Sequence, residues 1–192
     1  MTTKKNKSYI HWATPIEVRE GLDRMFPDGV DLDPCWNPGS KVRAKFKCDG
    51  TNFHPDPGYL KERLTGDGLL LDWTNELFSS IYVNPPYNAG AMKRWTHKIA
   101  WTADMHNRYA GPFHMIVLTA ARPSAQWWRT LVDAEPEVLL LWGPGRLSFE
   151  NPPPGYEESS STVESALWYF GSSPIDFREA FAERGTFWSL RT

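Results

Sequence analysis

Three continuous apolar runs constrain the fold of this chain more than any other feature. They are "FHMIVLT" at 113–119, "EVLLLW" at 137–142 and "ESALWYFG" at 164–171. None has the polar alternation of a strand that faces water on one side, so each predicts a strand buried on both faces. Amphipathic patterns at 89–105 and 124–134 predict helices. This alternation predicts an α/β domain in which helices cover both faces of a mostly parallel sheet.

Shorter patterns complete the predicted order of elements. The segment "ATPIEVREGLDRMF" predicts a helix, with Thr14 as its N-cap, Pro15 at the first helical position and Glu17 completing a capping box. Further predicted elements are short strands at 30–33, 68–73 and 80–84, a loop-like stretch at 34–57 and a terminal helix at 175–185.

Length and composition favour a single domain. The chain has 192 residues, of which 41% are hydrophobic, enough for one substantial core over 12–192. Residues 1–11 contain three lysines and no following apolar segment, which indicates a flexible basic arm and not a secretory signal. The segment "ENPPPGYEESSST" is polar and rich in proline, so 150–162 is predicted to be a flexible loop or an inserted hairpin.

Other classes of protein are disfavoured. No apolar run approaches the ~20 residues that a membrane-spanning helix needs. Two cysteines are too few for a disulfide framework, and no Cys-x-x-Cys spacing suggests zinc, so we expect a cytoplasmic protein without a metal. A net charge of −2 neither indicates nor excludes binding to nucleic acid.

The stretch "SSIYVNPPYNAG" carries the clearest chemical signal. An apolar run stops at Asn84, Pro85, Pro86 and Tyr87. The prolines cannot continue a strand, and the side-chain oxygen of Asn84 and the carbonyl of Pro85 are acceptors beside a flat ring. This group suits a planar ligand that bears N–H donors. An ordinary turn at the end of a strand is the alternative.

Polar residues also flank two other predicted strands. Asp33 ends one strand, and Asp67 precedes another. In a parallel sheet, ligands bind beyond the carboxyl ends of the strands, so we expect Asp33, Asp67 and Asn84 near one site. Each aspartate alone is as well explained by a helix cap or a turn.

The ordered set "WATP", "DLDPC", "GDGLLLDW", "YVNPPYN" and "GRLSF" resembles the phage-type (Dam-like) DNA adenine N6-methyltransferases over nearly the whole chain. The resemblance implies a Rossmann-like methyltransferase fold and S-adenosylmethionine as the methyl donor. Residues 84–87 would hold the target base. The donor would lie against Trp12, Thr14, Pro15, Asp33, Pro34, Cys35, Asp67, Gly68 and Leu69. The usual glycine-rich continuation after the first acidic strand is replaced by "DPCWNPGSKV", and Asp49 is the nearest candidate for the ribose.

The resemblance also implies double-stranded DNA as the partner, and we expect the protein to be a monomer or weak dimer. We expect Lys93, Arg146 and Phe149 to contact DNA beside Tyr87, and the segment 150–162 to be a flexible loop or a hairpin at the groove. The basic residues of the helix at 89–105 are equally typical of a solvated surface. Open alternatives are methyl transfer to another planar amine (cytosine, RNA adenine or protein glutamine) and a catalytically silent nucleic-acid-binding domain.

Overall fold

The computed structural model describes residues 13–50, 53–55, 66–108, 111–150 and 164–190. Four helices lie in this part of the chain: α1 (Ile16–Met25), α2 (Ala89–Arg108), α3 (Gln126–Asp133) and α4 (Pro174–Ala180). The strands are β1 (Val30–Asp33), β2 (Ala44–Cys48), β3 (Phe53–Pro55), β4 (Ser80–Val83), β5 (His114–Ala120), β6 (Val138–Trp142), β7 (Ser165–Gly171) and β8 (Gly185–Ser189).

The strands of the described residues form one sheet in the order β3-β2-β1-β4-β5-β7-β6-β8. Strand β1 pairs in parallel with β2 and β4, and β4 pairs in parallel with β5, whereas the other pairings are antiparallel. The order is compatible with the 3-2-1-4-5-6 arrangement of a Rossmann-like fold, with β7 inserted between β5 and β6 and with β8 at the edge. The predicted α/β class is confirmed, and the sheet is more mixed than expected.

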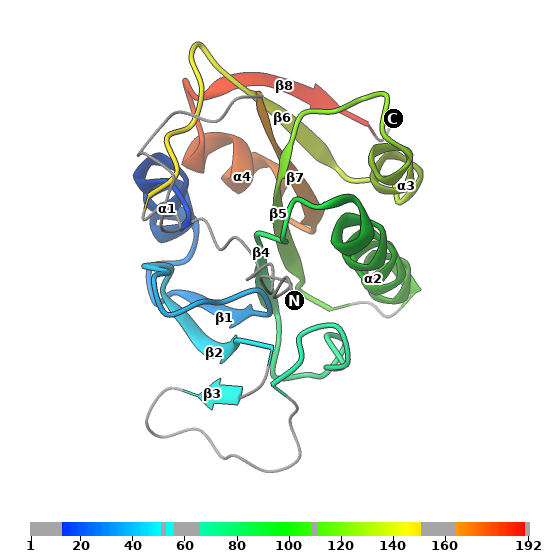
Figure 1. Cartoon of the computed structure of the whole chain (residues 1–192). Helices are drawn as coiled ribbons and strands as arrows, with labels where there is room; N and C mark the ends of the chain where they lie inside the picture. Colours follow the sequence, from blue (N-terminus) through cyan, green and yellow to red (C-terminus); the bar gives the residue numbers. More distant parts are fainter. Residues whose placement is uncertain (1–12, 51–52, 56–65, 109–110, 151–163, 191–192) are drawn as a thin grey trace, which may run out of the picture.

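Helices cover both faces of the sheet, as Figure 1 shows, with α2 and α3 on one face and α1 and α4 on the other. Each face has its own apolar core. Ile81 and Val83 of β4 join the core under α2, whereas Tyr82 between them joins the core under α1. Because successive side chains of a strand point to opposite faces, burial on both sides requires the continuous apolar runs seen in the sequence.

Helix α2 matches its prediction closely. Met92, Trp95, Ile99 and Thr102, which repeat at helical spacing, are all buried. No helix in the described part of the chain is long and apolar enough to cross a membrane.

Three expectations about the strands were wrong. The stretch at 34–57 contains β2 and β3, and the helix expected at 175–185 ends at Ala180 and is followed by β8, a strand that was not expected. In β2, lysines alternate with buried residues, and Lys45 forms an ion pair of 2.7 Å with Asp31, so this polar sequence is a strand with one charged side. Strand β8 lies at the edge of the sheet and is mostly exposed, so it lacks the apolar pattern of a buried strand.

The third error concerns the segment 68–73, which forms consecutive turns instead of a strand. The side chain of Asp67 accepts a hydrogen bond from the backbone N–H of Leu69 at 2.9 Å, and Asp72 does the same for Thr74 at 2.9 Å. These local bonds compete with strand pairing. The indole of Trp73 donates to the carbonyl of Gly68 at 2.7 Å, which closes the turn over a buried ring.

Candidate active site

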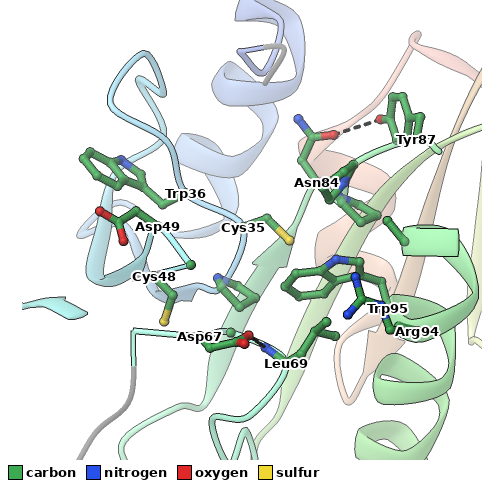
Figure 2. Close-up of a pocket in the computed structure, with 16 residues that line it drawn as sticks. Cys35, Trp36, Cys48, Asp49, Asp67, Leu69, Asn84, Tyr87, Arg94 and Trp95 are labelled. Carbon is green, nitrogen blue, oxygen red and sulfur yellow. Dashed lines mark hydrogen bonds between the residues drawn. The ribbon is translucent and has the colours of Figure 1, made fainter. Parts of the chain in front are cut away.

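A cavity of about 350 Å³ lies at the carboxyl ends of β1, β2 and β4. The order of the sheet reverses between β1 and β4, and open α/β sheets bind ligands at such a point. Figure 2 shows Trp36 and Asp49 on one side of the cavity and Arg94 and Trp95 on the other. The fold therefore brings the ends of separate strands together at one hollow.

Many of the sequence-predicted site residues line this cavity. They are Pro34, Cys35, Asp67, Gly68, Leu69, Asn84, Pro85, Pro86 and Tyr87, together with the ribose candidate Asp49. Gly68 has a steric reason to be glycine, because a Cβ atom there would lie 2.1 Å from the carbonyl oxygen of Pro34. The turn at 67–69 and the loop after β1 thus pack backbone to backbone to form one wall.

Both ends of the Asn84 amide are engaged by side chains. Its oxygen accepts a hydrogen bond of 2.8 Å from the hydroxyl of Tyr87, and its nitrogen donates to Oγ1 of Thr14 at 3.4 Å. Tyr87 is 37% exposed, and its ring packs edge to face with that of Phe149 at a centroid distance of 6.1 Å. Sequence reasoning assigned only the ring face of Tyr87 to function, so the contact made by its hydroxyl is new.

Thr14 differs from its predicted role. Helix α1 begins at Ile16 with Pro15 in the cap position, and no side chain caps it. The hydroxyl of Thr14 instead lies 3.1 Å from that of Tyr82, and Thr14 is buried. The capping box was wrong because this tertiary contact takes the hydroxyl. Neither Thr14 nor Pro15 lines the cavity, and Trp12 lies outside the described residues.

Asp33 lies in the protein interior and is not among the cavity-lining residues. Its carboxyl accepts a hydrogen bond of 3.0 Å from the backbone N–H of Cys35, while burial raises its pKa to about 7. Burial also raises the pKa of the Cys48 thiol to about 12 and that of Cys35 well above its ordinary value. Both thiols are therefore protonated at neutral pH, which makes them poor nucleophiles.

The predicted DNA contacts are spread over different surroundings. Lys93 is exposed on α2, and Arg146 is exposed but paired with Glu164 at 3.1 Å. Phe149 is only 6% exposed and packs in the core beside Tyr87, so its ring supports Tyr87 in this structure and offers little surface to a partner.

The two segments expected to be flexible fall largely outside the described residues. These are the arm at 1–11 and most of the loop at 150–162. Glu150, where that loop begins, is described. It forms ion pairs with Lys41 at 2.8 Å and Arg19 at 2.7 Å, and their hydrogen bonds hold the pKa of its carboxyl below the ordinary value.

Sequence reasoning did not assign several lining residues to the site. Ala91, Arg94 and Trp95 belong to the first turns of α2 and share one helix face, because they are separated by three and four residues. Their position directly after the Asn-Pro-Pro-Tyr segment was the available signal. The others, Trp36, Cys48 and Gly50, depend on the unrecognised strand β2 and on the loop after β1.

No protein-family model matches the chain, and no curated protein matches it. Among the described residues, no three His, Cys, Asp or Glu side chains gather into a group that could hold a metal ion. The side chains that line and border the cavity are therefore the chemical groups that a ligand would meet there.

Proposed function

We propose that this protein transfers the methyl group of S-adenosylmethionine to the 6-amino group of an adenine in DNA. The observation that carries the proposal is the Asn84 amide, which borders the cavity at the switch point of the sheet and is held at both ends by hydroxyl groups. An amide oxygen in this position is a fixed acceptor for an N–H group.

The chemistry explains why an acceptor is needed. The lone pair of the adenine amine is delocalised into the ring, so the amine is a weak nucleophile. Acceptors at the Asn84 side chain and the Pro85 carbonyl favour a tetrahedral nitrogen whose lone pair points at the donor methyl group. As positive charge develops on that nitrogen, both acceptors interact more strongly than they do in the ground state. The prolines fix the backbone in advance. The methylated amine then releases its proton to water.

The cavity fits a small charged donor. Its volume of about 350 Å³ lies within the range of small-molecule sites. Asp49 and Asp67 line it and supply carboxylates that suit hydroxyl or cationic groups, while Arg94 supplies a guanidinium for an anionic group. S-adenosylmethionine offers all of these partners: ribose hydroxyls, an ammonium group and a carboxylate. When bound, it would supply the electrophilic methyl group, and its sulfur would keep the electron pair of the broken S–CH3 bond and leave as the thioether S-adenosylhomocysteine.

The exposed ring of Tyr87 supports a flipped base as the acceptor. An adenine inside a duplex is out of reach, so it must leave the stack at a cost of a few kcal/mol. Stacking on Tyr87 would return about 1–3 kcal/mol. The exposed cations Lys93 and Arg146 are candidates for phosphate contacts. Such an enzyme would meet its DNA in a bacterial or phage-infected cytoplasm.

Purified protein incubated with methyl-labelled donor and unmethylated DNA, RNA or protein tests the proposal. We expect label in DNA, recovered as N6-methyladenine. The variant Asn84→Ala should reduce transfer by on the order of 100-fold, because the transition state loses a fixed acceptor. Donor affinity should stay the same. Asn75→Ala is a matched control, since Asn75 caps a nearby turn through Leu77 and does not line the cavity. Label only in RNA, in protein or at cytosine would overturn the choice of substrate.

A further inference from the structure

We infer that Thr14 is a positioning residue that, together with Tyr82, sets the orientation of the Asn84 amide for catalysis. This role rests on the proposed function, and it differs from the donor contact that the sequence resemblance implied for Thr14. It requires that Thr14 reach the acceptor side chain and that something hold Thr14 in place.

The contact is direct. Asn84 follows β4, and its side-chain nitrogen lies 3.4 Å from Oγ1 of Thr14. The same oxygen lies 3.1 Å from the hydroxyl of Tyr82, two residues before Asn84 in the strand. A threonine hydroxyl has one donor and two acceptor sites, so it can serve both neighbours at once. Thr14 thus links the side-chain amide of Asn84 to the buried phenol of Tyr82.

The hydroxyl of Tyr82, which is the partner of Thr14, is held in the core and stays neutral. Tyr82 is completely buried, and burial raises the pKa of its hydroxyl well above the ordinary value. The phenol is therefore neutral at physiological pH. A neutral hydroxyl in a packed core gives Thr14 a permanent hydrogen-bond partner, which restricts the rotation of the Thr14 side chain.

The backbone on both sides of Thr14 is also held. Ala13 and Glu150 exchange two backbone hydrogen bonds, of 3.0 and 3.2 Å. The guanidinium of Arg19 donates to the carbonyl of Thr14 at 3.2 Å and also bonds the Glu150 carboxylate at 2.7 Å. The segment is thus attached to α1 on one side and to the chain after β6 on the other, so Thr14 is a stable reference point for Asn84.

The Asn84–Thr14 distance is long for a hydrogen bond, as catalytic contacts often are before substrate binds. If Thr14 only satisfied the buried Tyr82, removing its hydroxyl would lower stability without a specific effect on turnover. If it orients Asn84, the loss must appear in kcat, because the amide acts most strongly in the transition state. The two roles therefore differ in the kinetic parameter that they change.

The test uses Thr14→Val, which keeps the shape and removes the hydroxyl, and Thr14→Ser, which keeps the hydroxyl. We expect Thr14→Val to lower kcat by about 3- to 10-fold, the equivalent of one hydrogen bond. KM for DNA and the Kd of the donor should change less than about twofold, because the hydroxyl of Thr14 is not proposed to contact either DNA or the donor. Thr14→Ser should restore kcat. Thr102→Val, at a buried threonine of α2 that bonds only its own helix, is the control for general destabilisation.

A second measurement does not depend on activity. The side-chain amide signals of Asn84, assigned by their loss in Asn84→Asp, should shift in Thr14→Val and keep their positions in Thr102→Val. Unshifted signals, or a kcat of Thr14→Val equal to that of wild type, would overturn the inference. A wild-type protein that methylates no DNA would refute the proposed function, while the amide signals would still decide whether Thr14 orients Asn84.

Discussion

Removing the hydroxyl of Tyr87 separates two roles of this side chain at the cavity. Its partly exposed ring is the surface that we propose for a flipped base, and its hydroxyl donates to the oxygen of Asn84 at 2.8 Å. Tyr87→Phe keeps the ring and removes only the bond. If only the ring of Tyr87 mattered, Tyr87→Phe would leave activity nearly unchanged. Because the hydroxyl bonds Asn84, we expect the substitution to lower activity.

The size of the effect follows from the geometry. A neutral hydrogen bond of this length contributes about 0.5–1.5 kcal/mol net, so Tyr87→Phe should lower kcat by about 2- to 10-fold. The same hydroxyl lies 3.4 Å from the carbonyl of Leu118, a weaker contact that adds little. Tyr87→Ala also removes the ring and should lose a further ~1–3 kcal/mol in kcat/KM.

Steady-state kinetics on matched duplexes and on duplexes with the target adenine in a mismatch separate the two terms. The further loss caused by removing the ring in Tyr87→Ala should be smaller on the mismatched duplex, where the adenine leaves the stack more easily. The loss caused by removing only the hydroxyl in Tyr87→Phe should be the same on both duplexes. Tyr169→Phe is a control, because the Tyr169 hydroxyl accepts a hydrogen bond from the backbone N–H of Ser173 and pairs with Nδ1 of His114, in another part of the fold. A Tyr87→Phe enzyme with wild-type kcat would refute the role given to the hydroxyl.

Three further predictions concern the cavity and its surroundings. Asp67→Ala should weaken donor binding by about 10- to 100-fold by calorimetric titration, whereas Asp72→Ala, which breaks a similar turn away from the cavity, should leave it unchanged. Gly68→Ala should cost about 1–3 kcal/mol of unfolding free energy in urea, because its Cβ would overlap the Pro34 carbonyl, while Gly111→Ala, with open space around its Cβ, should cost far less. Burial raises the pKa of Asp33 from 3.8 to about 7, so the wild-type protein loses stability as pH rises through this range. The free energy of unfolding of Asp33→Asn should therefore rise relative to that of wild type between about pH 4 and 7. A difference between the two proteins that does not change with pH would contradict that pKa.

The strands that are buried on both faces of the sheet were predicted correctly from the sequence. Strands β5, β6 and β7 face a core on both sides, so their apolar runs were unambiguous. Strand β2 and edge strand β8 were not predicted. Their polar side chains find partners or solvent, so these strands lack the apolar pattern of a buried strand. The turns at 68–73 failed because Asp67 and Asp72 bond locally, which an apolar pattern does not reveal.

The candidate site was predictable in part for a related reason. Residues that follow strands, such as Cys35 and Asn84, reach the same edge of the sheet once the strand order is correct. Contacts across the fold were not predictable. The partners of Thr14 lie 68 and 70 residues away in the chain, so a local capping pattern was the only reading that sequence spacing offered.

The central claim is methyl transfer to the 6-amino group of adenine in DNA, and the nucleosides of cellular DNA test it most directly. The chain is expressed in a host that lacks DNA methylation, and its DNA is digested and analysed by mass spectrometry. We expect N6-methyladenine with the wild-type chain and only traces of it with Asn84→Ala at equal protein levels. DNA without N6-methyladenine, or with 4-methylcytosine in its place, would contradict the account.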